Sequence, residues 1–283
     1  MTTGIRAACV IGWPVEHSRS PLIHNYWLKR YRIAGEYRRE LVPREEFAAF
    51  VDSLAARGYV GANVTLPHKE AALTLSEPDE RARAVGAANT LWLDDGNLRS
   101  TNSDVEGFLD NIDACAPNWG ASKAVVLGAG GAARAVIYGL LARGVERIVL
   151  VNRTLGRADL LRQTFGPRIQ IATWDEVSAA LADAALLVNT TTLGMHGQPA
   201  LTIDPAPLPR HAVVADLVYV PALTPLLAAA KARDLRTADG LGVLLHQAVR
   251  GFALWFGKKP EVTAELRARV EADLGASDEN RAG

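Results

Sequence analysis

Cysteine is scarce in this chain: among 283 residues only Cys9 and Cys115 occur, far apart in sequence. Neither belongs to a Cys-x-x-Cys pair or shows the spacing of a metal site. Disulfides are rare in reducing compartments, and two isolated cysteines fit such a compartment. The sequence therefore predicts two inert thiols, and we expect a cytoplasmic protein.

Long apolar runs are also missing. No stretch approaches the roughly 18 apolar residues that a membrane-spanning helix needs, so we expect no membrane segment. The residues up to Ile11 contain only a very short apolar run and lack the long hydrophobic region of a signal peptide. We expect them to form a strand that leads into a turn.

The chain has no net charge, because 25 Arg and 6 Lys balance 31 acidic residues. Proteins that bind nucleic-acid phosphates or anionic membrane surfaces carry a basic surplus, so both classes are disfavoured. With 49% hydrophobic and 22% charged residues the composition is that of an ordinary globular protein. At roughly 150 residues per domain, the length predicts about two domains.

The first hundred residues alternate short β-branched runs with helical segments, and Asp95-Gly96 marks a hairpin turn. Ser20 is the predicted N-cap of a helix that Pro21 opens, and Gly58 is predicted to close another helix. The expected strands are 7–11, 37–42, 59–65, 89–93 and 98–101. The expected helices are 20–30, 44–57, 69–75 and 80–85.

A second part follows a predicted helix over 104–115 and a break at 116–120. Its strands alternate with helices, which predicts a parallel sheet with right-handed crossovers. The expected strands are 124–127, 147–151, 186–189 and 212–216, with a helix over 132–143. Two helices, over 242–256 and 262–274, are expected near the end of the chain.

Glycines cluster after the first strand of this second part. Gly128-Ala129-Gly130-Gly131-Ala132-Ala133 follows a strand and opens a helix, and it fits the pattern Gly-x-Gly-x-x-(Gly/Ala). The glycines permit a tight turn and let the backbone approach a pyrophosphate, whose charge lies at the helix N-terminus. A Gly-rich turn alone also occurs for packing, but the surrounding strand-helix-strand pattern favours dinucleotide binding.

The end of the next strand indicates which dinucleotide binds. An NAD enzyme carries an acid about 20 residues beyond the first glycine, where it binds the ribose 2′-hydroxyl. Here the segment reads Asn152-Arg153-Thr154, with Arg157 one turn later. Two guanidinium groups and a hydroxyl suit a 2′-phosphate, so the sequence favours NADP.

Four polar clusters lie at strand ends or turns of the first part, where α/β proteins bind ligands. Hydroxyl and carboxamide groups dominate them, which suits a polyhydroxylated small molecule. His17 and His24 are seven residues apart and no cysteine joins them, so no metal site is expected. The clusters are Gly12–Pro21 with His24 and Asn25, Asn63–Lys69, Gly86–Thr90 and Thr101–Asp104.

Lys69 is one of only six lysines and lies within the pattern Asn-x-Thr-x-Pro-x-Lys. A partly buried Lys can exchange a proton near neutral pH, whereas Arg cannot. An ammonium near a carbonyl can stabilise and protonate the alkoxide that forms when hydride arrives. Asp104 is the candidate partner that would orient Lys69. A solvated lysine at a helix start is the simpler reading of Lys69 alone, but the neighbouring motifs favour catalysis.

These ordered motifs closely resemble those of the shikimate dehydrogenase family, NADP-dependent enzymes that reduce 3-dehydroshikimate in aromatic amino-acid and chorismate biosynthesis. The resemblance runs nearly end to end. It continues in Asn189–Met195, Asp216–Pro221, Thr224–Leu227 and Gly240–Gln247. The chain departs from the family pattern around Asp104, where Ser100, Ser103 and Val105 replace Gly, Thr and Gly.

The resemblance implies an α/β protein with two domains. An N-terminal substrate-binding domain would span 1–104, and a Rossmann-type NADP-binding domain would span 105–239. The C-terminal helices of 240–283 would return to the first domain, with the active site in the cleft between the domains. Shikimate or 3-dehydroshikimate would be the substrate, NADP the cofactor, and no metal, nucleic acid or membrane is implied. Monomer and homodimer both occur in the family.

The resemblance also implies residue roles. Lys69 and Asp104 would form the catalytic pair, and Ser18 and Ser20 would hold the substrate carboxylate. Further substrate contacts are implied for Asn63, Thr65, Asn89, Tyr219 and Gln247. Cofactor contacts are implied for Gly128, Ala129, Gly130, Gly131, Ala132, Asn152, Arg153, Thr154, Arg157, Thr190, Leu217 and Gly240. Glu80, an acid in the helix before Gly86, is assigned to the same cofactor site.

Two alternatives stay open. A quinate/shikimate or aminoshikimate dehydrogenase would share the scaffold, and kcat/KM on shikimate and quinate with each cofactor would distinguish it. A non-catalytic NADP-binding regulator would bind cofactor without turnover. The presence of both Lys69 and Asp104 argues against the regulator.

Overall fold

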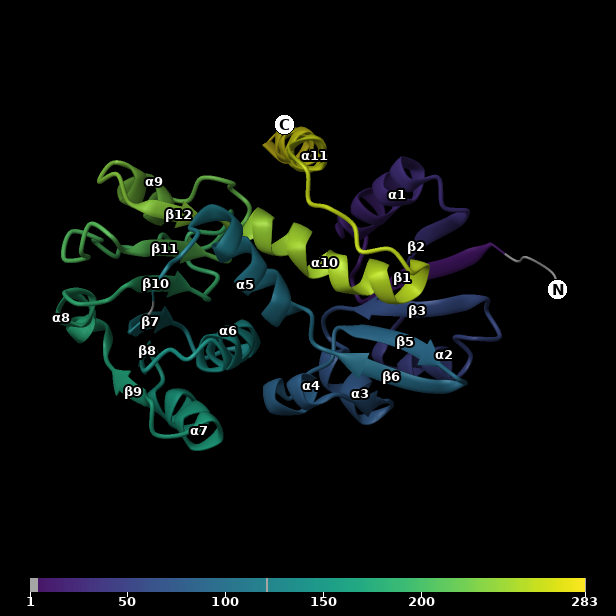
Figure 1. Ribbon diagram of the computed structural model, residues 1–283, viewed down its shortest axis with the longest axis horizontal. Helices are drawn as coiled ribbons and strands as arrows, with labels where there is room; N and C mark the ends of the chain where they lie inside the picture. The colour runs from purple at the N-terminus through teal and green to yellow at the C-terminus, as the bar shows by residue number, and fades with distance from the viewer. Residues whose placement is uncertain (1–4, 121, 283) are drawn as a thin grey trace. The chain divides into compact units, whose positions relative to one another are not determined.

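The computed structural model describes residues 5–120 and 122–282, with side chains as far as residue 276. The chain divides into two compact units, and Figure 1 labels most elements of both. One unit contains the residues up to Ser103 together with those from Leu245 onward, and the other runs from Asp104 to Leu244. Each unit is built on its own six-stranded sheet, so the α/β fold class is confirmed.

The sheet of the first unit is mixed, with the strand order β2-β1-β3-β5-β6-β4. β1 pairs in parallel with β2 and β3, and β5 pairs antiparallel with β3 and β6. Asp95 and Gly96 both have positive φ in the turn between β5 and β6, which confirms the predicted hairpin. The strands are β1 (Arg6–Gly12), β2 (Gly35–Leu41), β3 (Tyr59–Val64), β4 (Glu77–Pro78), β5 (Thr90–Asp94) and β6 (Asn97–Thr101).

Two helix predictions in this unit were wrong in detail. Ser20 is the first helical residue rather than the N-cap, which is Arg19. The hydroxyl that accepts a backbone N–H at this helix start belongs to Ser18, which accepts the Ser20 N–H over 3.3 Å. The helix expected over 44–57 is a 3-10 turn followed by a short α-helix. The α-helix ends at Asp52, and the hydroxyl of Ser53, the next residue, donates to the carbonyls of Ala49 and Phe50. The elements are α1 (Ser20–Tyr31), η1 (Arg44–Glu46), α2 (Phe47–Asp52), α3 (Lys69–Thr74) and α4 (Glu80–Val85).

The C-terminal part of the chain completes the first unit. α10 (Gly240–Phe256) begins in the second unit and ends in the first, and α11 (Ala264–Ala282) follows it. The Trp255 indole donates its N–H to the carbonyl of Leu91 over 2.8 Å. Gly61 on β3 lies against the same indole, where a Cβ would overlap the ring. The end of α10 is thereby packed on strands β3 and β5.

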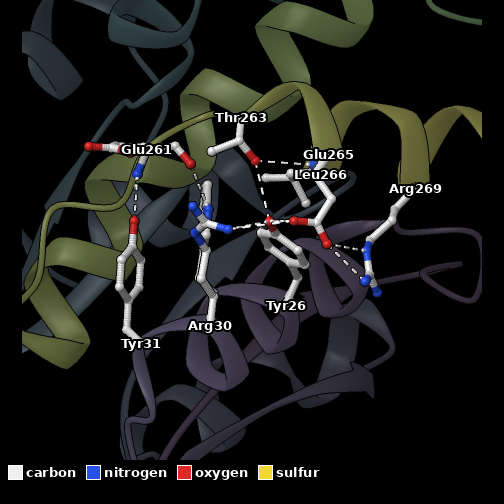
Figure 2. Close-up of polar contacts among 9 residues, drawn as sticks. Tyr26, Arg30, Tyr31, Glu261, Thr263, Glu265, Leu266 and Arg269 are labelled. Atoms are coloured by element: carbon white, nitrogen blue, oxygen red, sulfur yellow. Dashed lines mark hydrogen bonds and ion pairs between the residues drawn. The ribbon is translucent and has the colours of Figure 1, made fainter.

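Polar contacts join α11 and the segment before it to α1, as Figure 2 shows. The Tyr26 hydroxyl donates to Glu265 over 3.0 Å, and the Trp27 indole donates to the Glu261 carbonyl over 2.9 Å. The Glu261 N–H in turn bonds to the Tyr31 hydroxyl over 3.0 Å. Contacts between segments at opposite ends of the sequence therefore stabilise one unit.

The sheet of the second unit is entirely parallel, as predicted, with the order β12-β11-β10-β7-β8-β9. This is the doubly wound order of dinucleotide-binding domains. The chain adds β7, β8 and β9 toward one edge of the sheet, returns to the middle, and adds β10, β11 and β12 toward the other edge, so the switch point lies between β7 and β10. Ligands bind at the carboxyl ends of the strands beside this switch point. The strands are β7 (Lys123–Leu127), β8 (Arg147–Val151), β9 (Ile169–Ala172), β10 (Leu186–Asn189), β11 (Val213–Asp216) and β12 (Arg236–Ala238).

Apolar strands and helices build the core of this unit. Leu127, Val151, Leu187 and Val214 are buried on the sheet. At the opposite end of the strands Asp183 pairs with Lys123 and Arg147, which ties the starts of β7, β8 and β10 together. The helices are α5 (Asp104–Cys115), α6 (Gly131–Ala142), α7 (Leu155–Phe165), η2 (Trp174–Glu176), α8 (Val177–Leu181) and α9 (Pro225–Lys231).

Among the described residues, no helix combines the length and the apolar character needed to cross a bilayer. Neither cysteine forms a disulfide: Cys9 is buried in β1, and Cys115 is exposed at the end of α5.

Candidate functional site

The Gly-rich turn lies between β7 and α6, at the switch point of the second sheet. Gly128 has a φ of +99°, and a Cβ there would lie 2.8 Å from Thr191 and 2.9 Å from Thr190. At Gly130 and Gly131, by contrast, no other group lies within 4 Å of an added Cβ. Gly130 is the N-cap of α6 and supplies no side-chain cap, so the first N–H groups point out of the helix. The turn is therefore a cradle that fits a pyrophosphate.

The end of β8 presents the residues expected to choose between NAD and NADP. Asn152 is half-buried and donates to the Thr154 carbonyl over 2.8 Å, which shapes the turn into α7. Arg153, Thr154 and Arg157 are exposed. Neither guanidinium has an ion-pair partner among the residues that the structure describes. Two positive charges at this strand end fit a 2′-phosphate.

Thr190, Leu217 and Gly240 are joined to this turn through the neighbouring strand ends. The Thr190 hydroxyl donates to the Leu127 carbonyl over 2.7 Å, directly before Gly128. Leu217 donates its N–H to the Asn189 carbonyl over 3.0 Å, and a Cβ at Gly240 would overlap the Leu217 carbonyl. Ala129 and Ala132 lie in the turn itself and at the start of α6. The structure thus brings most predicted cofactor residues to one edge of the sheet.

A buried polar network occupies the first unit where β3 and β6 end and β5 begins. Asn63 donates to the Asn89 carbonyl and to the Thr90 hydroxyl, each over 3.2 Å. The Asn89 side-chain oxygen accepts the Ser103 N–H over 2.8 Å. The Ser103 hydroxyl lies 3.5 Å from the Gln247 side-chain oxygen on α10. Asn63, Asn89 and Gln247, predicted as substrate residues from three distant segments, therefore belong to one network.

Four further predicted residues of the first unit follow the carboxyl ends of β1 and β3, on the loops or at the helix starts: Ser18, Ser20, Thr65 and Lys69. Ser18 is half-buried and Ser20 is buried at the start of α1. Thr65 donates its N–H to the Ile11 carbonyl over 2.9 Å, which holds the loop after β3 against the end of β1. Lys69 is the first residue of α3, is half-buried, and accepts the Ala88 N–H at its carbonyl over 2.9 Å.

Asp104, Tyr219 and Glu80 are three further predicted site residues. Asp104 follows Ser103 and is the first residue of α5, in the second unit, whereas Lys69 belongs to the first. Tyr219 is half-buried in the loop after β11. Glu80 is exposed on α4 in the first unit, while the Gly-rich turn belongs to the second. The roles of these three residues, like those of the other predicted site residues, stay predictions.

Two buried polar residues at these sites received no role in the sequence analysis. The Tyr37 hydroxyl donates to Asn63 over 2.6 Å, and the Tyr37 ring stacks on His24. Asp216 accepts hydrogen bonds from Asn189, Val218 and Thr224. Tyr37 and Asp216 lie within strand patterns that are typical of a core, so only the tertiary contacts reveal them.

Burial controls the titration of two of these groups. It lowers the pKa of His24 to about 3, although the nearby Asn63 opposes part of the shift. Neither ring nitrogen has a partner at hydrogen-bonding geometry in the described part of the chain. Burial also raises the pKa of the Asp216 carboxyl, and the hydrogen bond from Thr224 is the strongest of those opposing that rise.

No group of three or more His, Cys, Asp or Glu side chains within the described residues could hold a metal ion. The side chains predicted to contact substrate and cofactor carry mainly hydroxyl, amide, ammonium and guanidinium groups.

Three family models match the chain in order. Residues 10–91 match the shikimate dehydrogenase substrate binding domain, and residues 112–196 match shikimate / quinate 5-dehydrogenase. Residues 240–268 match the shikimate 5′-dehydrogenase C-terminal domain. The first match covers most of the mixed sheet, and the second contains the Gly-rich turn.

Solved structures with the same fold include shikimate 5-dehydrogenase from Thermus thermophilus in complex with NADP(H) and shikimate. It has a TM-score of 0.84 and 33% identity, over 95% of this chain and 99% of that one. Quinate dehydrogenase from Corynebacterium glutamicum in complex with NAD has a TM-score of 0.87 and 30% identity, over 94% and 99%.

Curated relatives are much closer in sequence. Shikimate dehydrogenase (NADP(+)) from Rhodopseudomonas palustris strain TIE-1 is 67% identical over 270 residues, covering 95% of this chain and 97% of the relative. The protein of the same name from Nitrobacter winogradskyi is 63% identical over 274 residues, covering 96% and 98%. Over nearly its whole length, with its Gly-rich turn and its buried Asn63–Asn89 network in place, this chain belongs to the shikimate dehydrogenase family.

Proposed function

We propose that this protein catalyses the reversible NADP-dependent reduction of 3-dehydroshikimate to shikimate, in aromatic amino-acid and chorismate biosynthesis. The observation that carries the proposal is the 67% identity to a shikimate dehydrogenase (NADP(+)) over 95% of the chain. The open glycine cradle and the exposed guanidinium groups of Arg153 and Arg157 support the choice of NADP.

The second unit would hold the cofactor. Backbone N–H groups of the turn from Gly128 to Ala132 would bind the pyrophosphate, and Arg153, Thr154 and Arg157 would bind the 2′-phosphate. Asn152, Thr190, Leu217 and Gly240 would line the same edge, with Glu80 as a further contact. NADPH, when bound, supplies the hydride for reduction at C3 of the substrate.

Lys69 is the general acid in the direction of reduction and the general base in the reverse direction. As the substrate carbonyl becomes an alkoxide, the ammonium of Lys69 stabilises the negative charge and donates a proton to the oxygen. Asp104 orients Lys69, and its carboxylate accepts a hydrogen bond from a substrate hydroxyl. The position of Lys69 at the start of α3, held by the Ala88–Lys69 backbone bond, supports this role.

Substrate binding falls to polar groups of the first unit and the loop after β11. Ser18 and Ser20 bind the carboxylate, while Thr65, Tyr219 and Gln247 contact the ring substituents. Both amide hydrogens of Asn63 are already donated within the protein. Its oxygen, which accepts from Tyr37, keeps one lone pair for a substrate hydroxyl. The Asn89 side-chain oxygen already accepts hydrogen bonds from Ser103 and Thr90, which would hold Asn89 in place for its predicted substrate contact.

A direct assay follows NADPH absorbance at 340 nm with NADP⁺ and shikimate, and in parallel with NADP⁺ and quinate. We expect efficient turnover with shikimate; absence of turnover with purified, folded protein would refute the function. Quinate dehydrogenase is the second candidate, favoured by the structural likeness to the Corynebacterium glutamicum enzyme. A higher kcat/KM for quinate, or for NAD⁺ over NADP⁺, would favour that candidate.

We further propose the division of labour described by the ranges 1–104 for substrate binding, 105–239 for NADP binding and 240–283 for helices that complete the substrate domain. The absence of a disulfide between the two cysteines supports a reducing, cytoplasmic location. Light scattering after size-exclusion chromatography distinguishes a monomer from a homodimer.

A further inference from the structure

Asp216 is a buried carboxylate at the end of β11 that the proposed chemistry does not use. Its side chain is only 1% exposed. One carboxylate oxygen, Oδ1, accepts from the Asn189 amide over 2.9 Å and from the Val218 N–H over 3.0 Å. The other, Oδ2, accepts from the Thr224 hydroxyl over 2.7 Å. Three donors converge on one buried charge, which is a costly arrangement unless all of them are retained.

The contacts of Asp216 continue to the Gly-rich turn. Asn189, held through its amide nitrogen, uses its oxygen to accept the N–H and the hydroxyl of Thr191 over 3.0 Å and 2.7 Å. The Thr191 hydroxyl also accepts the Leu193 N–H over 3.1 Å. The methyl group of Thr191 lies against Gly128, so close that an added Cβ at Gly128 would be only 2.8 Å from it. The chain of contacts therefore runs from Asp216 through Asn189 and Thr191 to the first glycine of the turn.

A second branch of contacts leads from Asp216 along its own strand end. The Val218 N–H that it binds follows Leu217, whose N–H bonds to the Asn189 carbonyl. Asp216 thus fixes the backbone on both sides of the switch-point edge: the loop after β10 and the loop after β11. Both loops carry residues assigned to the cofactor site, Thr190 and Leu217.

We propose that Asp216 is a positioning residue for NADP, which sets the shape of the Gly-rich turn through Asn189 and Thr191 without touching the cofactor. The proposal rests on the assignment of NADP binding to the second unit. It predicts that cofactor affinity, rather than substrate affinity, depends on the hydrogen-bond acceptors of this buried side chain.

The first test compares Asp216→Ala with Asp216→Asn. Asp216→Ala removes all three acceptor contacts, and we expect a rise of about tenfold in the Kd for NADPH, from the loss of hydrogen bonds to a charged group. Asp216→Asn keeps an oxygen for Asn189 and Val218, and we expect the Kd to stay within about threefold of the unmodified protein. The Kd is measured by NADPH fluorescence titration without substrate. The KM for shikimate should change little in both variants.

Asp183→Ala is the matched control, since it removes a carboxylate that joins three segments at the opposite end of the same sheet. It should lower the melting temperature and leave the Kd for NADPH unchanged. An equal rise of Kd in Asp183→Ala and Asp216→Ala would show a general loss of stability and overturn the proposal. So would an unchanged Kd in folded Asp216→Ala, or an equal rise in the KM for shikimate.

If Asp216→Ala does not fold, Thr191→Val decides the question. It keeps the shape of the side chain and the contact with Gly128 but loses the hydroxyl bonded to Asn189 and Leu193. We expect a higher Kd for NADPH and faster hydrogen exchange at the Thr191 and Leu193 amides in cofactor-free protein. An unchanged Kd would refute the proposal. The unmodified protein's turnover on shikimate tests the proposed function separately.

Discussion

The imidazole of His24 lies flat against the phenol ring of Tyr37, with ring centroids 4.1 Å apart and an interplanar angle of 7°. Trp27, Phe252 and Trp255 surround the same imidazole, so it is enclosed by aromatic rings from α1, β2 and α10. Through its hydroxyl Tyr37 donates to Asn63, a predicted substrate residue. The His24 imidazole, a group that titrates near neutral pH in solution, is therefore uncharged here and packs against Tyr37, which binds Asn63 of the candidate site.

This burial predicts that the protein loses stability in mild acid. The pKa of His24 is about 3 when folded and 6.5 when unfolded, so the unfolded state binds the extra proton between these values. The contribution of the neutral His24 to the free energy of unfolding is therefore complete above about pH 6.5. It is lost as the pH falls toward 3, and the total loss is roughly 4–5 kcal/mol. His24→Phe keeps the stacked ring and should flatten this part of the unfolding profile. Urea denaturation at several pH values measures it.

His211→Gln is the control for this prediction, because His211 is exposed on the surface of the second unit. Its profile should follow that of the unmodified protein. Identical acid sensitivity in His24→Phe and the unmodified protein would show that other groups dominate the transition.

Lys69→Ala should lower kcat by about 10²–10⁴-fold with little change in the KM for shikimate, because proton transfer is lost while binding contacts remain. Lys69→Arg should not restore activity, since a guanidinium cannot release the proton. Lys29→Ala, on an exposed residue of α1, is the control. Steady-state kinetics at 340 nm measure all three variants, and an unaffected kcat in Lys69→Ala would exclude the proposed role.

The combined substitution Arg153→Ala and Arg157→Ala should raise the KM for NADPH by about tenfold to a hundredfold, while the KM for NADH changes little. Both side chains are exposed, so the fold should be unaffected. Arg81→Ala, on α4 of the first unit, serves as the control because it removes one guanidinium charge from another part of the chain. An equal rise in KM for both cofactors would contradict a 2′-phosphate contact.

Gly61→Ala should destabilise the first unit by about 2–4 kcal/mol, because the added Cβ would overlap the Trp255 indole and the Leu91 carbonyl. The two groups that it would push apart form the 2.8 Å hydrogen bond between α10 and β5. Gly120→Ala, where nothing lies within 4 Å of the added Cβ, should be nearly neutral. Guanidinium denaturation compares the two; similar midpoints would show that the helix can shift without cost.

The local patterns predicted those parts of the fold that depend on near neighbours. The hairpin at Asp95-Gly96 was confirmed because the turn needs positive φ, which this dipeptide tolerates. The parallel sheet around Gly128 was confirmed because its strands are buried on both faces and form short apolar runs in the sequence. The helix of 44–57 was wrong, because the Ser53 hydroxyl competes for backbone carbonyls in a way that helical periodicity does not show.

The sequence by itself determined the family, the cofactor class and the identity of the polar residues, because these depend on side-chain chemistry and on motifs of short spacing. Only the tertiary structure decided which other residues hold those polar side chains in place. Asn63 and Gln247 share a network although most of the chain separates them, and Asp216 reaches the Gly-rich turn through Asn189. Hydrogen bonds between distant segments form only once strand order and helix packing bring buried donors and acceptors together, where each must find a partner.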